Sequence, residues 1–423
     1  MSHHQLRVAP GQLRDPAPAT GPRWSSASWR RAALLAVAAW AGVIAVISRI
    51  GMTHSLDLLV YRQAASNMLH GGATYTSTFA DHLYFTYPPF ALLVFSPLAT
   101  LSMHTAVWVW DLCNVLALAV ALSVLVRRCV SVSRTHAAVL GALVAAMSCL
   151  LFEPLRNSLL NGQVNLVLIC AVVLDVFVVP PRARGLLIGL AAAIKLTPLV
   201  FVLYLLIAKE HRAAARAVAG FAVATAVAWL VLPHDSATFW LHQAFSPAHK
   251  GGTMSDWNQS WWGFVGRLPA SDGSVRTAVW LAASAATLGV GIYVARCYVA
   301  RGRRVDALFV IAVTGLLVSP VSWTHHWSWV AVIPVLLLAR NGRHRAVTIA
   351  MVVLLVLTIP SPYGWHLRGA WPLNFSLAIV AAGLLVVMAT VEWRASRHTD
   401  GALDQGPLDA AEVHAYAGPR AGD

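Results

Sequence analysis

Nearly uncharged apolar blocks follow one another along most of this chain, from Ala32 to Val391. Hydrophobic residues occupy 58% of its 423 positions and charged residues only 11%, whereas an ordinary soluble domain carries about 25% charged residues. A helix needs roughly 20 apolar residues to cross the hydrocarbon core of a bilayer. The blocks therefore predict a polytopic membrane protein. They exclude a soluble enzyme, a secreted disulfide scaffold and a DNA-binding module as descriptions of the whole chain.

The predicted fold is all-α, with about 10–12 transmembrane helices, some of them broken or re-entrant. Residues 32–392 form the expected transmembrane domain. The tails at 1–31 and 393–423 are polar and lack hydrophobic periodicity, so we expect both to be disordered and cytoplasmic. The expected outer loops lie at about 51–88, 153–163, 233–276, 319–326 and 360–372.

The positive charge of the chain predicts its orientation. Most of the 31 Lys and Arg residues lie in one alternating set of loops, including those around Arg127, Arg182 and Lys209. Loops rich in Lys and Arg face the cytoplasm. Because the charges lie in short clusters between apolar blocks, the net charge of +14 does not indicate a nucleic-acid partner. The more varied polar residues lie in the opposite loops, so we expect function at the periplasmic boundary of the plasma membrane.

Two segments do not fit simple alternation. Gly185–Ala208 has basic clusters at both ends, and Pro198 near its middle lacks a backbone donor. We therefore predict two half-helices that turn back near the outer face and place Lys195 there. Pro89–Val126 contains two apolar blocks where an odd number of crossings is needed, so one of these blocks is expected to be interfacial or re-entrant.

Three residues are candidates for catalysis. Asp57 follows the first apolar block, where a partly desolvated carboxylate would suit a general base; the alternative is a helix-capping aspartate. His325 and His326 lie between tryptophans at another boundary. They would serve in acid–base chemistry or phosphate binding, or they are boundary histidines of an aromatic belt.

Two basic residues are candidates for binding a phosphate. Lys195, one of three lysines in the chain, would cost about 2.5–3.5 kcal/mol near the bilayer midplane, so it should face a polar pocket. Arg267 lies in a long outer loop, where its guanidinium could clasp a phosphate. The alternative for Arg267 is a solvated surface arginine.

Amide and indole side chains on the same side suit a sugar substrate. Asn161, Gln163 and Asn165 offer donors and acceptors for hydroxyl groups, although this spacing also fits an ordinary turn between helices. Trp323 and neighbouring tryptophans could stack on sugar rings, although anchoring at the membrane boundary is the commoner use of tryptophan.

The sequence lacks the usual signatures of nucleotides and metals. It contains no G-x-G-x-x-G or Walker loop and no H-E-x-x-H pattern, and its five cysteines show no ligand spacing. A sugar donor would therefore be delivered within the membrane as a lipid, and we expect neither a cofactor nor a bound metal.

Taken in order along the chain, these residues resemble glycosyltransferase family 87, a family of actinobacterial integral-membrane α-(1→2)-mannosyltransferases. The similarity covers roughly Asp57 to Trp327. Its motifs are Asp57 with Tyr61, Tyr87-Pro88-Pro89, Asn161-Gly162-Gln163-Val164-Asn165, Lys195-Leu196-Thr197-Pro198, Asn258-Gln259-Ser260 and Ser319 to His326.

The resemblance implies a GT-C-type fold and a polyprenyl-phosphate mannose donor. The implied acceptor is a mannosylated glycolipid of the cell envelope, either a phosphatidylinositol mannoside or lipomannan/lipoarabinomannan. Transfer would occur among membrane lipids, on the periplasmic side and without a metal. Asp57 resembles the base that deprotonates the acceptor 2-hydroxyl, and direct displacement would invert the anomeric centre.

The remaining matched positions receive supporting roles from the resemblance. His325 and His326, together with Lys195 and Arg267, would balance the charge that develops on the leaving phosphate. The other matched positions would bind substrate: Tyr61, Tyr87, Asn161, Gln163, Asn165, Asn258, Gln259 and Trp323.

Two alternatives remain open at this level. A transporter or flippase of lipid-linked glycans also uses broken helices, but it would be expected to show inverted repeats and polar residues on both faces. A related arabinosyltransferase or protein O-mannosyltransferase could use the same scaffold with a different substrate.

Overall fold

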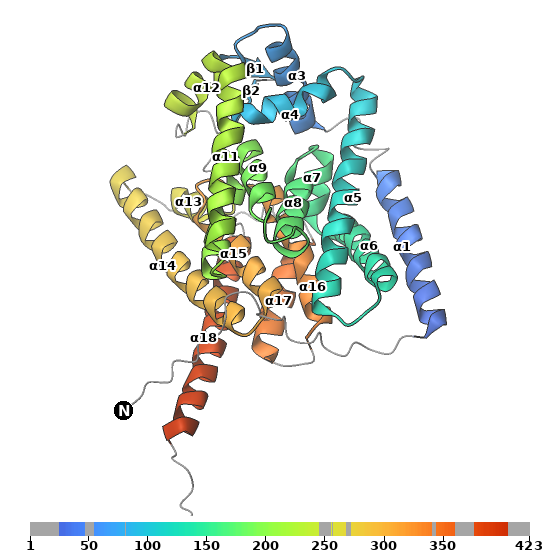
Figure 1. Cartoon of the computed structure of the whole chain (residues 1–423), viewed down its shortest axis with the longest axis vertical. Coiled ribbons are helices and arrows are strands. Elements are labelled where there is room, and N and C mark those ends of the chain that lie inside the picture. The colour runs from blue at the N-terminus through green and yellow to red at the C-terminus, as the bar shows by residue number, and fades with distance from the viewer. Residues whose placement is uncertain are drawn as a thin grey trace, which may run out of the picture.

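The computed structural model describes residues 25–46, 55–80, 82–244, 255, 257–267, 272–340, 344–359 and 376–404. The expected outer loop at 360–372 lies outside these residues, as do most of the N-terminal tail and the end of the C-terminal tail. Figure 1 shows a bundle of helices with a smaller helical cap at one end.

Almost all regular structure is helical. The elements in chain order are α1 (Ser26–Val46), α3 (Leu56–Leu69), η2 (Thr74–Thr76), β1 (Thr78–Phe79), β2 (Leu83–Tyr84), α4 (Pro89–Ala99), α5 (Met103–Cys129), α6 (Arg134–Leu151), α7 (Glu153–Leu160), α8 (Asn165–Phe177), α9 (Leu186–Ile194), η3 (Thr197–Leu199), α10 (Val200–Ile207), α11 (His211–Val231), α12 (Pro233–Thr238), η4 (Phe239–Gln243), α13 (Trp261–Gly266), α14 (Gly273–Ala300), α15 (Arg304–Val318), η6 (Thr324–Ala331), α16 (Val332–Leu338), α17 (Arg345–Leu357) and α18 (Ser376–Asp404). Within the described residues, the only sheet is the antiparallel pair β1–β2.

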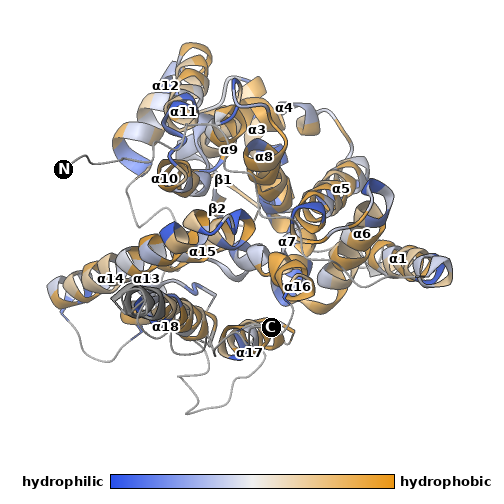
Figure 2. Ribbon diagram, turned by 60° about the horizontal axis from the view of Figure 1, so that its bottom comes forward, coloured by the Kyte–Doolittle hydropathy of each residue, from blue (hydrophilic) through white to orange (hydrophobic). Residues whose placement is uncertain are grey.

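Several helices are long and apolar enough to cross a membrane. In the part of the chain that the structure describes, five meet this condition: Met103–Cys129, Arg134–Leu151, His211–Val231, Gly273–Ala300 and Leu377–Arg397. Figure 2 shows the predominance of apolar residues along α5 and α6. Ser102 and Ser133 begin these two helices, each accepting a hydrogen bond from a backbone N–H in the first turn. The all-α, multi-pass membrane class predicted from the composition is confirmed.

Other apolar blocks are broken, as the sequence predicts. Helices α7 and α8 meet at an angle of 114° around Asn161–Val164. The Gly185–Ala208 block contains α9 and α10, separated by an extended residue at Lys195 and the short turn η3. This break places the lysine at the point where the block reverses.

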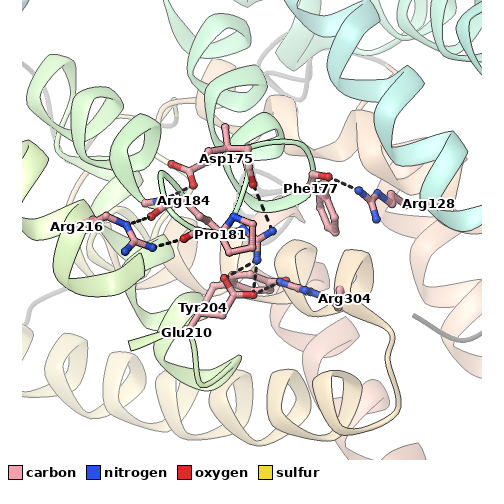
Figure 3. Close-up of polar contacts among 11 residues, drawn as sticks. Arg128, Asp175, Phe177, Pro181, Arg184, Tyr204, Glu210, Arg216 and Arg304 are labelled. Atoms are coloured by element: carbon pink, nitrogen blue, oxygen red, sulfur yellow. Dashed lines mark hydrogen bonds and ion pairs between the residues drawn. The ribbon is translucent and has the colours of Figure 1, made fainter. Parts of the chain in front are cut away.

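Contacts at the far ends of α9 and α10 show that the block turns back on itself. Arg184, just before α9, pairs with Glu210, just after α10, with 2.9 Å between Nη1 and Oε1, and Arg304 Nη2 lies 2.6 Å from the same oxygen (Figure 3). Gly185 has φ +102°, and a Cβ there would lie 2.0 Å from the carbonyl oxygen of Ala213. Both basic clusters therefore lie on one side, which confirms the predicted re-entrant path.

Helix α4 explains how the Pro89–Val126 segment can contain two apolar blocks and still cross the membrane an odd number of times. This helix has only 11 residues, about half the length of a membrane span, and Figure 1 shows it beside α3 in the cap at the end of the bundle. Arg62 of α3 donates to the carbonyl oxygen of Leu98 at 3.0 Å and to that of Leu101. Helix α4 is therefore the predicted non-crossing element.

Two apolar cores support the site. The larger core lies among the long helices, and a second core lies between the α3–α4 cap and the outer ends of α5 and α8. In the second core Tyr61 stacks on Phe95 with 4.4 Å between ring centroids, and Trp110 meets Phe95 edge-on. Helix α1 begins at Ser26 and α18 continues to Asp404, so helical structure extends past both ends of the 32–392 domain.

Candidate active site

The turn between α7 and α8 positions Asp57 in the first turn of α3. The backbone N–H groups of Asp57 and Leu58 both donate to the carbonyl oxygen of Asn161, at 3.0 and 3.1 Å. Gly162 has φ +68°, and a Cβ there would lie 2.5 Å from Cβ of Leu58. Trp110 Nε1 donates to the carbonyl oxygen of Gly162 at 2.7 Å. The close approach that only glycine permits therefore holds the start of α3 against this turn.

A buried relay of polar side chains leads inward from Asp57. Gln163 hydrogen-bonds to the Asp57 carboxylate, and its Oε1 accepts a hydrogen bond from the Tyr87 hydroxyl at 3.0 Å. The Tyr61 hydroxyl donates to the Tyr87 oxygen at 2.8 Å. These contacts bring together four predicted site residues from three separate parts of the chain.

Lys195 ends the relay at the break between α9 and η3. Its Nζ donates to Asn165 Oδ1 at 2.9 Å, to Nε2 of His326 at 3.0 Å and to the Tyr87 hydroxyl at 3.3 Å. All three hydrogens of the ammonium group thus have partners. These polar contacts are the kind expected for a lysine within an apolar block.

The two histidines lie in the first turn of η6. An ammonium group can only donate, so Nε2 of His326 must accept, and this ring is neutral with its proton on Nδ1. Asn165 fixes the neighbouring residue by donating from Nδ2 to the backbone oxygen of His325 at 3.0 Å. Nε2 of His325 is buried and has no hydrogen-bond partner in the described part of the chain, so it remains available to a substrate group.

Burial and two neighbouring groups determine the electrostatic setting of Asp57. Burial raises the pKa of this carboxyl from 3.8 to about 6, although the hydrogen bond from Gln163 and the positive charge of Lys195 act in the opposite direction. A carboxylate with a pKa near 6 is largely ionised at neutral pH and binds a proton more readily than an exposed aspartate.

A mostly apolar cavity of about 230 Å³ adjoins this cluster. Asn165 and His326, which both hold Lys195, are among its polar lining residues, together with Ser322. The rest of its wall comes from α8, α10 and α15, with Leu168, Phe201 and Leu316 among the lining residues. The described residues contain no group of three His, Cys, Asp or Glu side chains that could hold a metal ion.

Four other predicted site residues form a separate, backbone-directed network. Asn258 pairs with Trp323 in an isolated β-bridge and donates from Nδ2 to the carbonyl oxygen of Pro320 at 2.9 Å. The backbone N–H of Gln259 donates to the carbonyl oxygen of Ser322 at 2.8 Å. The guanidinium of Arg267 donates to the carbonyl oxygens of Ser255 and Asn258.

Arg267 therefore holds the backbone of its own loop. Its N–H groups contact backbone oxygens instead of the lysine–histidine cluster. Asn258, Gln259 and Trp323 fix the backbone that leads into η6. The sequence groups these four with the direct substrate contacts because a sequence shows which polar residues share a loop and does not show which atoms they bind.

A second chain of polar side chains contacts the residue before the histidines, and it includes Glu153 and Asn157, which were not predicted as site residues. Thr324, the first residue of η6, donates its hydroxyl to Glu153 Oε1 at 3.1 Å and accepts a hydrogen bond from Asn157 Nδ2 at 2.9 Å. Asn161 donates from Nδ2 to the carbonyl oxygen of Asn157 at 2.9 Å. The signal in the sequence that could have linked Asn157 to this chain is its four-residue spacing from Asn161, which places both on one helix face.

Comparison with known proteins identifies the family. The model of glycosyltransferase family 87 matches residues 85–320, more than half of the chain. The chain belongs to glycosyltransferase family 87. It is therefore a membrane glycosyltransferase, as the motifs predicted, and the transporter alternative is not supported. The matched range includes Tyr87, Gln163, Asn165 and Lys195, whereas Asp57 and the two histidines lie just outside it.

Several curated relatives are similar over most of this family 87 chain. A polyprenol-phosphate-mannose-dependent α-(1-2)-phosphatidylinositol mannoside mannosyltransferase of Mycobacterium tuberculosis is 34% identical over 71% of this chain and 74% of its own length. The corresponding phosphatidylinositol pentamannoside enzymes of M. tuberculosis and Mycolicibacterium smegmatis are each 30% identical. The M. tuberculosis match covers 79% of both chains, and the M. smegmatis match covers 82% of this chain and 88% of the relative. No solved structure matches the chain.

Proposed function

We propose that this glycosyltransferase moves mannose from polyprenyl-phosphate mannose to a phosphatidylinositol mannoside on the periplasmic side of the plasma membrane, forming an α-(1→2) linkage with inversion. The observation that carries the proposal is the mostly apolar cavity whose lining includes Asn165 and His326, the residues that hold Lys195. A lipid phosphate needs an apolar surface that binds its lipid chain and a cation that binds its phosphate. The names of the relatives support the same donor and acceptor.

Asp57 is the proposed base. Its carboxylate takes the proton from the acceptor 2-hydroxyl as the oxygen attacks the anomeric carbon of the donor mannose. The bond from that carbon to the phosphate oxygen breaks on the opposite face, so a β-linked donor gives an α-linked product. Because phosphate is a good leaving group, a single carboxylate suffices where a glycosidase needs two.

Lys195 is the proposed partner of the leaving phosphate. Its ammonium is held by Asn165 and His326 beside the cavity, so its charge is in position before the reaction begins. Since His326 is neutral, its role is to orient the lysine. The free Nε2 of His325 would hydrogen-bond to a phosphate oxygen or a sugar hydroxyl.

The opposite locations of the site and the basic clusters support the periplasmic assignment. Arg127 and Arg128 lie in the last turn of α5, whereas Trp110, near its other end, contacts the turn that holds Asp57. The basic end faces the cytoplasm, so the site faces the opposite side.

The direct test is transfer by the purified protein in lipid vesicles. With polyprenyl-phosphate mannose and a phosphatidylinositol mannoside, we expect a product with one additional 2-linked α-mannose. With polyprenyl-phosphate arabinose, or with a peptide acceptor, we expect no product. Transfer of arabinose or mannosylation of a peptide would replace this proposal with one of the related reactions.

The pKa of Asp57 predicts an acid limb in the rate. The active form is ionised, so kcat/KM should fall about tenfold for each pH unit below a pKa of about 6. A phosphodiester donor does not titrate in this range, so the limb reports on the protein. An initial-rate profile from pH 4.5 to 8 measures it. A rate that stays constant down to pH 5 would contradict the assignment of Asp57 as the base.

A further inference from the structure

Helix α7 contacts both segments that carry the proposed catalytic residues. At its C-terminal end, the carbonyl oxygen of Asn161 accepts the backbone N–H of Asp57 at 3.0 Å. At its N-terminal end, Glu153 Oε1 accepts the hydroxyl of Thr324 at 3.1 Å. Because Thr324 is followed directly by His325 and His326, one rigid helix of eight residues connects the base to the histidine turn.

The contact between Glu153 and Thr324 is protected from water. The Thr324 side chain is fully buried and Glu153 is only 6% exposed. The Thr324 hydroxyl is held on both sides, since it donates to Glu153 and accepts from Asn157 Nδ2 at 2.9 Å. Because both groups are buried, water does not compete for this hydrogen bond, and it fixes the first residue of η6.

A purely stabilising role does not explain this carboxylate. Oε2 of Glu153 is buried and has no hydrogen-bond partner in the described residues. A buried polar atom without a partner destabilises the folded state. A well-packed apolar residue would serve stability better, and local departures from good stability tend to occur at functional sites.

We infer that Glu153 is a positioning residue for mannosyl transfer, acting through Thr324 to hold the His325–His326 turn at a fixed distance from Asp57. The inference rests on the proposed roles of Asp57 and the histidines. It adds that α7 sets the spacing between them and that Glu153 itself touches no substrate. Small errors in the spacing of reacting groups lower the chemical step strongly.

The test is a double-mutant cycle on the full-length protein in lipid vesicles, with kcat and KM measured separately for donor and acceptor. Thr324→Val removes the hydroxyl, and Glu153→Leu removes the acceptor oxygens. We expect each to lower kcat by about tenfold or more, with the donor KM changed by less than about twofold. Because both remove the same contact, the double variant should be no slower than the slower single variant.

The conservative variants provide the rescue. Thr324→Ser keeps the hydroxyl and Glu153→Gln keeps an acceptor oxygen at Oε1, so both should stay within about threefold of wild type. The acid limb of kcat/KM near pH 6 should be unchanged in all four variants, because none of them alters the Asp57 carboxylate. A merely structural defect would lower the unfolding temperature and leave kcat per folded molecule unchanged.

A matched control is Thr314→Val in α15. Thr314 is also fully buried, its hydroxyl donates to the carbonyl oxygen of Val310 at 2.8 Å, and its side chain packs against Gly291 of α14 instead of lining the cavity. It should keep the wild-type kcat. Should Thr324→Val not be recovered as folded protein, Thr324→Ala takes its place in the same cycle.

Two outcomes would overturn the inference. Wild-type kcat in Thr324→Val and Glu153→Leu would show that the contact does not position the histidines. Losses that multiply in the double variant would show that the two residues act independently. If these variants behave as wild type while Asp57→Asn is inactive, only the inference fails; if Asp57→Asn retains activity, the proposed catalytic roles fail as well.

Discussion

Replacing Asp57 by Asn is expected to lower kcat by about 10³-fold, within the range of about 10² to 10⁴ that general-base catalysis contributes. The amide has the shape of the carboxylate, and its oxygen can still accept the hydrogen bond from Gln163, so the fold and the relay should persist. What is lost is the group that takes the proton from the acceptor hydroxyl. Single-turnover transfer with saturating donor measures the effect on the chemical step.

A matched control for this change is Asp272→Asn. Asp272 is exposed, lies immediately before α14 and accepts a hydrogen bond from the hydroxyl of Ser274 at 3.0 Å. It therefore allows the same Asp→Asn substitution to be made outside the site. We expect wild-type turnover from it. Turnover by Asp57→Asn within tenfold of wild type would remove Asp57 as the base.

Replacing Lys195 by Met is expected to lower kcat by about 10²- to 10³-fold, the usual effect of removing one group that stabilises developing negative charge. Methionine fills a similar volume but carries no charge. It would also leave Asn165 Oδ1 and Nε2 of His326 without their donor, at a stability loss of about 1–3 kcal/mol. Rates should therefore be expressed per folded molecule, from size-exclusion profiles and unfolding curves recorded in the same detergent.

Lys209→Met is the control that separates the loss of the charge in the site from general effects of a Lys→Met substitution. Lys209 is exposed at the basic end of the molecule, beyond α10, and is not among the contacts of the site. We expect no change in kcat. If Lys195→Met keeps more than a tenth of wild-type activity, another group must balance the phosphate charge, and the free Nε2 of His325 is then the first to examine.

The path of the chain could be predicted where charge and hydrophobicity oppose each other. The basic clusters on both sides of Gly185–Ala208 leave only a re-entrant path, and the ion pair between Arg184 and Glu210 has this geometry. Pro89–Val126 contains two apolar blocks but needs an odd number of crossings, so one of the blocks must be a short element that does not cross. This element is α4. These predictions succeed because a misplaced charge in a membrane costs more than local helix propensity can offset.

Some contacts of the candidate residues could be predicted from the sequence, and others could not. A lysine at membrane depth requires polar partners, and they are Tyr87, Asn165 and His326. Arg267 has the same chemical type, but it lies at a boundary where water and backbone oxygens are both available. Its contact with Ser255 and Asn258 therefore depends on the loop conformation, which composition does not determine.

The positioning role of Glu153 could not be predicted from the sequence, for a related reason. An acidic residue in the first turn of a helix is expected for the helix dipole alone, so its position carries no further signal. Its contact with Thr324 joins residues 171 positions apart in the chain. Only the folded structure shows that both ends of α7 support the proposed catalytic groups.

The central claim of the proposal is that Asp57, Gln163 and His325 belong to one site that faces the periplasm. The most direct measurement is labelling of single cysteines placed at positions 57, 163 and 325, in a protein whose five native cysteines are replaced, with a membrane-impermeant thiol reagent on intact cells. We expect all three to react from outside and to be protected by the glycolipid acceptor. Reaction of any of them only after the cytoplasmic face is exposed would contradict the account.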